Sequence, residues 1–298
     1  MTIGTWQKEE TVMKKFGWYL MSVVPLLVML AVQVTVAVVM MLGWMIGAGP
    51  EGGMELYMEN SIVLVMWMHI LSLLITGLWY YLYVVLRQRR MEIPFAGQFT
   101  GRSFGYTVML AFGAQFLIGI LLTVWQLAAP EMIEAYNQMM EESGIAQTTF
   151  ASVFATVILA PVGEEIIFRG LTIEYLKRAG ARFWVINVIQ ALLFGIAHMN
   201  LVQGAYAFLL GLLCGYMTLR YRSLLAGIAV HFVFNAYGTF ATPALNLLFG
   251  PEPSPAVEIV YYVAAVAAGL GLFLGGLKLV RRDLEEKEES CAPATEAV

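Results

Sequence analysis

The sequence has little charge, few cysteines and almost no aspartate, and each shortage excludes a class of protein. Charged residues make up 13% of the 298 residues, whereas a soluble domain has about 25%. The net charge of −4 excludes the basic surface of a nucleic-acid-binding protein. The two cysteines, Cys214 and Cys291, lie far apart and do not indicate a disulfide framework. The only aspartate is Asp283, which excludes an aspartyl protease because that chemistry needs a pair.

Long hydrophobic runs make up most of the sequence. Hydrophobic residues make up 60% of the chain, and a membrane-spanning helix needs about 20 apolar residues. We therefore predict an all-α, polytopic integral membrane protein with about eight transmembrane helices. The predicted spans cover residues 16–49, 61–86, 104–129, 150–168, 183–199, 204–219, 224–249 and 257–280, and the fifth and sixth are short.

The positions of the charges predict the orientation. If the N-terminus is cytoplasmic and eight spans alternate, all 17 Lys and Arg residues fall on the cytoplasmic side. They include Arg87, Arg89 and Arg90 after the second span and Arg169 at the end of the fourth. The charged residues of the opposite loops are glutamates. This split follows the positive-inside rule and predicts that both termini are cytoplasmic.

The chain is expected to form one membrane domain with short cytoplasmic ends. We expect a cytoplasmic segment at 1–15, the membrane domain at 16–280 and a cytoplasmic tail at 281–298. No feature marks a eukaryotic source, so we expect a prokaryotic cytoplasmic membrane. The polar residues that carry chemistry lie between about 150 and 240.

Two adjacent glutamates lie in the fourth predicted span, where ionisable groups are costly. Glu165 and Arg169 are four residues apart and share a helix face, so they are expected to pair. Glu164 lies about 100° around the helix from Glu165 and is free to point elsewhere. Pro161 and Gly163 come just before them and predict a helix break that turns a helix N-terminus toward Glu164.

Histidines and an asparagine supply further polar groups within the spans. His198 ends the fifth span, and His231 and Asn235 share one face of the seventh. Three helices thus each carry polar groups that need an interior partner, and we expect them to surround one hydrated cavity. His69 in the second span has no partner identifiable from the sequence and is interpreted as structural.

These groups fit hydrolysis by activated water. The sequence has neither a G-x-S-x-G nor an H-E-x-x-H motif. In one chemistry, Glu164 is a general base on water oriented by His198, and His231 and Asn235 donate hydrogen bonds to the oxyanion. In the other, Glu164, His198 and His231 bind a divalent metal such as zinc, which activates the water. The residues leave both open.

Three motifs resemble those of a known family. Residues 164–169 (EEIIFR) match E-E-x-x-x-R, residues 194–198 (FGIAH) match F-x-x-x-H, and residues 231–235 (HFVFN) match H-x-x-x-N. In this order they resemble the signature of the CAAX prenyl protease and bacteriocin-processing family, also called CPBP or Abi.

The resemblance implies an intramembrane endopeptidase with a cavity that faces the cytoplasm. It implies that Glu164 activates water with His198 as its partner, and that His231 and Asn235 stabilise the oxyanion. Family members are commonly labelled metalloproteases, although a metal-free glutamate mechanism has been argued.

The same resemblance implies supporting residues and a substrate class. Glu165 and Arg169 would support the site. The partners would be the lipid bilayer and a membrane-embedded or lipidated peptide or protein substrate, as in the cleavage of prenylated C-a-a-X tails or bacteriocin processing.

Two other functions compete with the protease. One is a transporter or channel in which the carboxylates and histidines bind a cation or relay protons. The chain has no internal repeat, whereas many transporters are built from repeats. The other is a non-catalytic membrane scaffold or immunity protein, for which an intact motif set is not required.

Overall fold

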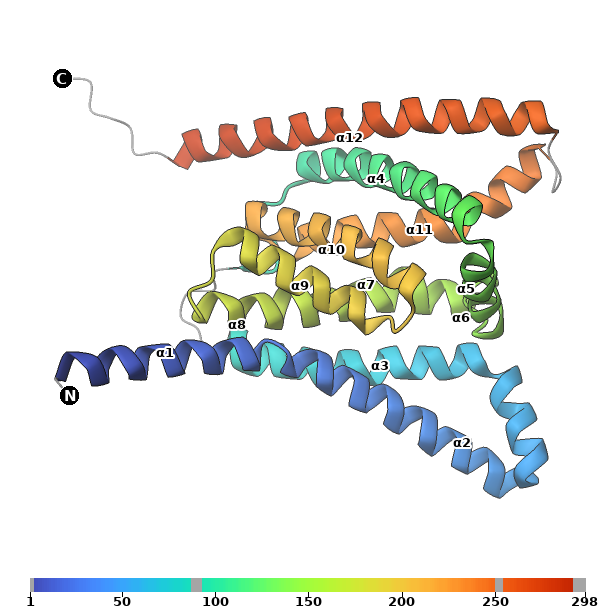
Figure 1. Ribbon diagram of the computed structural model, residues 1–298, viewed down its shortest axis with the longest axis horizontal. Coiled ribbons are helices and arrows are strands. Elements are labelled where there is room, and N and C mark those ends of the chain that lie inside the picture. The colour runs from blue at the N-terminus through green and yellow to red at the C-terminus, as the bar shows by residue number, and fades with distance from the viewer. Residues whose placement is uncertain (1–2, 87–92, 250–253, 292–298) are drawn as a thin grey trace.

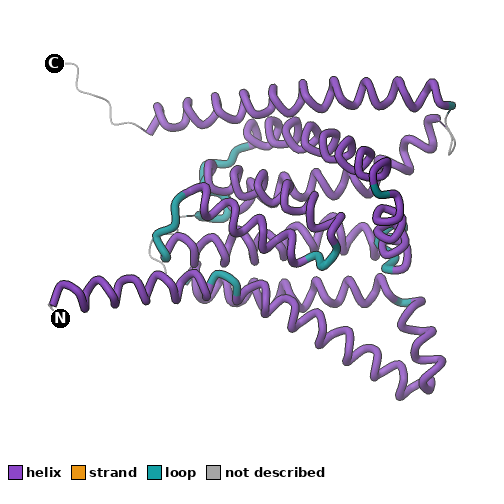
Figure 2. The backbone as a smooth tube through the Cα atoms, viewed as in Figure 1, coloured by secondary structure: helices purple, strands orange, loops and turns teal. Residues whose placement is uncertain are grey.

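The computed structural model describes residues 3–86, 93–249 and 254–291, and every regular element assigned within them is helical. Figure 1 shows most helices running along one long axis, and Figure 2 shows the short loops that connect them. The elements are α1 (Ile3–Met21), α2 (Val24–Glu59), α3 (Ser61–Tyr80), η1 (Tyr81–Val85), α4 (Gly101–Ala128), α5 (Pro130–Glu142), α6 (Phe150–Val153), η2 (Phe154–Leu159), α7 (Ala160–Glu165), η3 (Ile166–Thr172), α8 (Ile173–Arg178), α9 (Phe183–Ala197), α10 (Leu201–Tyr221), α11 (Leu224–Phe249) and α12 (Pro255–Cys291). The η elements are π-helical.

The number of spans agrees closely with the prediction. Within the described residues, seven helical stretches are long and apolar enough to cross a membrane. The remaining predicted span, the fifth, is α9, a shorter apolar helix of 15 residues. The sixth was predicted to be short but is the 21-residue helix α10. The predicted all-α, multi-pass membrane fold is confirmed.

The first helix begins and the last helix ends at the same end of the bundle. α1 begins and α12 ends there, whereas the short helix α5 lies at the opposite end (Figure 1). This arrangement is expected of a chain that crosses the membrane an even number of times. Arg87, Arg89 and Arg90, which belong to the predicted charge asymmetry, lie outside the described residues, so the orientation stays a prediction.

The first predicted span ends at a backbone irregularity. Gly49 has a φ of 78°, in the left-handed region that glycine adopts without steric penalty, and Pro50 follows it. The helix changes direction at this point and continues to Glu59 (Figure 1). The end of the span at Gly49 agrees with the sequence prediction.

The segment with the two glutamates is one continuous helix that contains π-helical turns. Residues 150–178 form a single helix of 29 residues. In η2, the N–H of Ala160 bonds to the carbonyl of Ala155, five residues earlier. Pro161 has no N–H. The carbonyl of Thr156 is therefore left without a backbone donor.

The predicted helix break before Glu164 is wrong. The chain accommodates Pro161 by a π-helical turn, which shifts the hydrogen-bond partners without ending the helix. No helix N-terminus therefore faces Glu164 within this described segment. Because α7 is flanked by η2 and η3, the glutamates lie between two places where the backbone departs from regular α-helix.

Close helix packing surrounds this central helix. Its middle part contacts α3, α9 and α11. Next to it, α9 and α10 approach until a Cβ on Gly195 would lie 2.7 Å from the carbonyl oxygen of Gly204. Small residues permit such close approach of helices in membranes. The result is a dense core in which Phe168 and Phe194 are almost completely buried.

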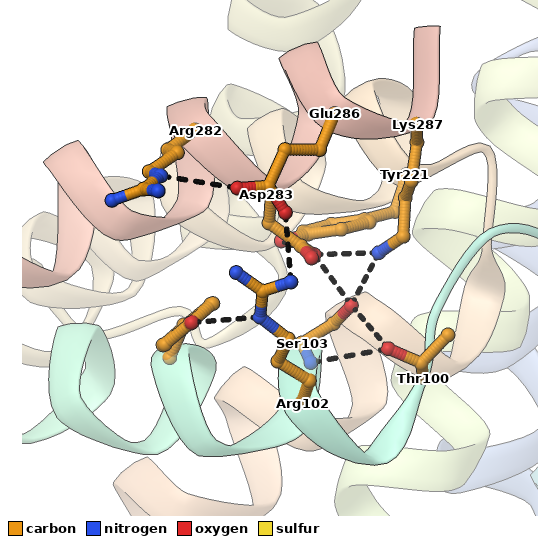
Figure 3. A network of polar contacts seen from close by, with 9 residues as sticks. Thr100, Arg102, Ser103, Tyr221, Arg282, Asp283, Glu286 and Lys287 are labelled. Atoms are coloured by element: carbon orange, nitrogen blue, oxygen red, sulfur yellow. Dashed lines mark hydrogen bonds and ion pairs between the residues drawn. The ribbon is translucent and has the colours of Figure 1, made fainter. Parts of the chain in front are cut away.

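The predicted tail begins inside a helix and is partly buried. α12 continues through residues 281–291, and its polar side chains contact α4 and the end of α10 (Figure 3). Asp283 is 3% exposed. Its Oδ2 accepts hydrogen bonds from Ser103 Oγ at 2.7 Å, Tyr221 Oη at 2.9 Å and Lys287 Nζ at 2.5 Å. This carboxylate therefore joins three helices at the end of the bundle where α1 begins and α12 ends.

We expect Asp283→Ala to destabilise the protein. The substitution leaves the buried hydroxyls of Ser103 and Tyr221 without their acceptor, which costs about 1–3 kcal/mol. The measurement is thermal or denaturant unfolding of the purified protein in detergent.

Glu286→Ala is the matched control on the same helix. Glu286 forms exposed ion pairs with Arg102 and Arg282, and exposed pairs contribute little to stability. Equal losses for both variants would contradict the anchoring role of Asp283.

Candidate active site

A completely buried ion pair lies at the bottom of the site. Arg169 Nη1 lies 2.9 Å from Glu165 Oε1, and both side chains are 0% exposed. The Arg169 guanidinium also donates from Nη2 to the carbonyl of Gly211 at 3.2 Å. Its Cζ lies 4.6 Å from the centre of the Phe194 ring, which is a cation–π contact. The predicted pairing of Glu165 with Arg169 agrees with this geometry.

Arg169, which the sequence analysis counts on the cytoplasmic side, is not a surface residue. Its guanidinium is buried within the bundle, where Glu165 neutralises it and Phe194 covers it. A paired arginine can be stable at a depth where a single one would be very costly. Charge counting treats every arginine as hydrated and cannot detect this difference.

Arg169 is also supported by polar groups that belong to none of the three motifs. The Gly211 carbonyl accepts a second hydrogen bond from Gln190 Nε2 at 2.9 Å. Asn187 donates to the neighbouring carbonyl of Leu212 at 3.0 Å. Gln190 and Asn187 are polar residues in an apolar helix, which is the signal that would have identified them. The carbonyl acceptors give no sequence signal, because every residue has one.

His231 connects the buried pair to the second glutamate. Its Nδ1 lies 3.0 Å from Glu165 Oε1, and its Nε2 lies 3.8 Å from Glu164 Oε2. Since a carboxylate paired with arginine accepts hydrogen bonds, the Nδ1 of His231 is the donor. One turn earlier on α11, a Cβ on Gly227 would lie 2.5 Å from Glu165 Oε2. Glycine therefore lets α11 approach the carboxylate.

Glu164 points to a different side of the helix, as its spacing from Glu165 predicts. Its side chain is 16% exposed, whereas that of Glu165 is 0% exposed. The Glu164 carboxylate faces His231 with one oxygen and His69 with the other, at 3.8 and 3.7 Å. Glu164 is therefore the more accessible carboxylate and has imidazoles on two sides.

The sequence interpretation of His69 missed this partner. His69 lies on α3, and its Nδ1 is 2.9 Å from the carbonyl of Val65. Its Nε2 faces Glu164 Oε1. The contact joins residues far apart in the chain, and His69 belongs to none of the three motifs. The one signal in the sequence is that a histidine lies within a membrane span.

His198 lies at the end of α9, next to the same aromatic ring. Its Nδ1 is 2.9 Å from the carbonyl of Phe194. The Phe194 ring contacts the rings of His198 and His231 edge to face, with centroid distances of 5.0 and 5.5 Å. Phe194 thus contacts two of the predicted histidines. Among the described contacts, none joins His198 directly to Glu164.

Asn235 occupies the position that the π-helical turn leaves open. Its Nδ2 donates to the carbonyl of Thr156 at 2.8 Å, which is the carbonyl left without a backbone donor. Asn235 lies one turn after His231 on α11, so both project toward the central helix. The amide carries two N–H groups, and this bond uses one of them.

A bound metal is the alternative that the sequence leaves open. Metal ligands must converge within about 2.0–2.3 Å of one point. In the described part of the chain, no group of three or more His, Cys, Asp or Glu side chains is arranged to hold an ion. The candidates Glu164, His198 and His231 do not form such a group, so their arrangement does not fit a zinc site.

Comparisons with known proteins agree with the motifs. Residues 146–237 match the family model of the Rce1-like type II CAAX prenyl endopeptidases. The chain is also similar to an uncharacterized 24.3 kDa protein of Escherichia coli, at 29% identity over 181 residues, which cover 59% of this chain and 78% of that protein. No solved structure matches. The predicted family resemblance is thus confirmed by a match that covers residues 146–237 of the chain.

Proposed function

We propose that this chain is an intramembrane endopeptidase that hydrolyses a peptide bond of a membrane-embedded or lipidated protein or peptide. The observation that carries the proposal is the pair of adjacent glutamates with different partners. Glu165 contacts Arg169 and His231, whereas the described ionic contacts of Glu164 are with imidazoles. An accessible carboxylate among imidazoles is suited to accept a proton from water.

In the proposed reaction, Glu164 is the general base. It accepts a proton from water while the water oxygen bonds to the carbonyl carbon of the peptide. The carbonyl electrons move to its oxygen and form the tetrahedral oxyanion. When the C–N bond breaks, Glu164 returns the proton to the leaving nitrogen, so that the products are a carboxylic acid and an amine.

His198 is proposed to orient the water. Its Nδ1 donates to the Phe194 carbonyl, because a carbonyl oxygen can only accept. In the neutral ring, Nε2 is then an acceptor that can hold one hydrogen of the attacking water. The Phe194 ring keeps the imidazole in this orientation through the edge-to-face contact.

Asn235 is proposed to stabilise the oxyanion, with His231 beside it. One N–H of the Asn235 amide donates to Thr156, and the other is the proposed donor to the oxyanion. The bond to Thr156 holds the amide in place before the reaction, which is the condition for effective electrostatic stabilisation. His231 adds a donor when its Nε2 carries a proton.

We propose that the site is reached from the cytoplasm of a prokaryotic cell. Glu164 lies about 21 Å along its helix from Phe150, at 1.5 Å per residue. With Phe150 at the outer boundary of a hydrocarbon core about 30 Å thick, Glu164 lies in the cytoplasmic half. A lipidated tail inserted from the cytoplasmic leaflet would reach this depth.

We expect Glu164→Gln to lose at least about 10²-fold in the rate of peptide cleavage, the lower range for a general base. The amide keeps the size of the side chain but cannot accept the proton from water. The measurement is cleavage of a peptide library by the purified protein in detergent, read by mass spectrometry.

Glu131→Gln is the matched control, because Glu131 is an exposed glutamate on α5. It should cleave at the wild-type rate. Ion or proton flux in liposomes without any peptide product would instead support a transporter. A cellular phenotype that survives Glu164→Gln would support a scaffold or immunity protein.

We expect Asn235→Ala to lower kcat by about 10²–10³-fold, the typical effect of removing one oxyanion donor. KM should change little, because the lost bond forms only in the transition state. Steady-state kinetics on the cleaved peptide, with the unfolding midpoint as a check on folding, provide the measurement. A rise in KM at constant kcat would contradict the assigned role.

A further inference from the structure

His69 is the imidazole at the site that comes from outside the matched segment. It lies on α3 (Ser61–Tyr80), whereas the family match begins at residue 146. Its side chain is 19% exposed, and its Nε2 lies 3.7 Å from Glu164 Oε1. α3 packs against α7, the helix that carries Glu164. The contact therefore connects two helices that are packed together.

The hydrogen bond on the far side of the ring fixes which nitrogen faces Glu164. Nδ1 lies 2.9 Å from the Val65 carbonyl, and a carbonyl can only accept, so Nδ1 carries a hydrogen. This bond within α3 fixes the orientation of the ring. Nε2 is therefore the atom presented to the carboxylate, and a proton on it would point toward Oε1.

His231 makes the same kind of contact from the opposite side. Its Nδ1 donates to Glu165, and its Nε2 lies 3.8 Å from Glu164 Oε2. The two oxygens of Glu164 thus each face an Nε2, one from α3 and one from α11. Distances of 3.7–3.8 Å exceed a direct hydrogen bond, and such contacts in catalytic sites often shorten when the reaction complex forms.

We propose that His69 is a positioning residue that holds the carboxylate of Glu164 from α3. The inference rests on the proposed role of Glu164 as the general base. When the Nε2 atoms of His69 and His231 both carry a proton, each donates to one carboxylate oxygen, and the carboxylate keeps one orientation toward the water. Without His69, Oε1 is free and the side chain can rotate toward its exposed side. His69 does not contact the substrate in this scheme, so it affects kcat rather than KM.

The first test uses three variants on α3. His69→Leu removes the ring nitrogens, and we expect kcat for peptide cleavage to fall about 10- to 100-fold, as for a misplaced catalytic group, with KM within about twofold of wild type. His69→Gln places an amide N–H close to the position of Nε2 and should restore part of the rate.

Thr76→Val is the matched control. Thr76 is buried two turns along α3, and its hydroxyl bonds to the Ser72 carbonyl. This variant removes a buried polar group from the same helix and should leave kcat unchanged. A wild-type kcat in His69→Leu, or an equal loss in Thr76→Val, would overturn the proposal while leaving the protease function intact.

A second test measures the contact without relying on catalysis. The unfolding midpoints of His69→Leu, Glu164→Gln and the double variant form a double-mutant cycle. We expect the shift in the double variant to differ from the sum of the single shifts, because both substitutions act on one contact. Additive shifts would overturn the proposal. If no peptide is cleaved by the wild type, the protease function fails, and the cycle still decides whether His69 holds Glu164.

Discussion

The ion pair between Glu165 and Arg169 is the constraint on which the rest of the site depends. Two opposite charges with no exposure to solvent are stable within a membrane protein only if each is paired and hydrogen-bonded. Arg169 is paired with Glu165, donates a hydrogen bond to the Gly211 carbonyl, and has Phe194 against its face. The same carboxylate oxygen of Glu165 orients His231. The pair therefore fixes helices α9, α10 and α11 around the central helix at one point.

The irregular backbone of the central helix is a second constraint on the site. Pro161 cannot donate, and the π-helical turn before it leaves the Thr156 carbonyl without a backbone partner. In a membrane, a carbonyl in that state needs another donor. Asn235 fills this need. A local defect in the helix thus becomes a binding site for a side chain of another helix, which fixes the distance between α11 and the central helix.

The sequence predicts the fold class and most of the site because membranes penalise polar groups so strongly. An isolated charge within a span is rare unless it has a function, so Glu164, Glu165, His198 and His231 stand out without any structure. The lengths of the apolar runs likewise predict the spans, apart from the underestimated length of α10.

The parts that the sequence does not predict depend on contacts between distant segments. His69 approaches Glu164 only because α3 packs against α7, and no spacing rule connects two such helices. The carbonyl oxygens of Gly211 and Thr156 act as acceptors, and because every residue has such an oxygen the sequence does not mark them. The burial of Arg169 is not predicted, because its charge looks the same in the sequence whether the guanidinium is hydrated or paired.

The adjacency of the two glutamates explains how one short segment can be both rigid and reactive. Neighbouring residues on a helix point about 100° apart, so Glu165 turns into the bundle while Glu164 faces the more accessible side. Their surroundings separate their roles, as in other sites where two carboxylates act differently. Since both belong to the same helical turn, any force that fixes Glu165 also fixes the backbone of Glu164. The buried pair therefore fixes the backbone that carries the accessible carboxylate. The imidazoles of His69 and His231 affect only the side-chain rotamer of Glu164.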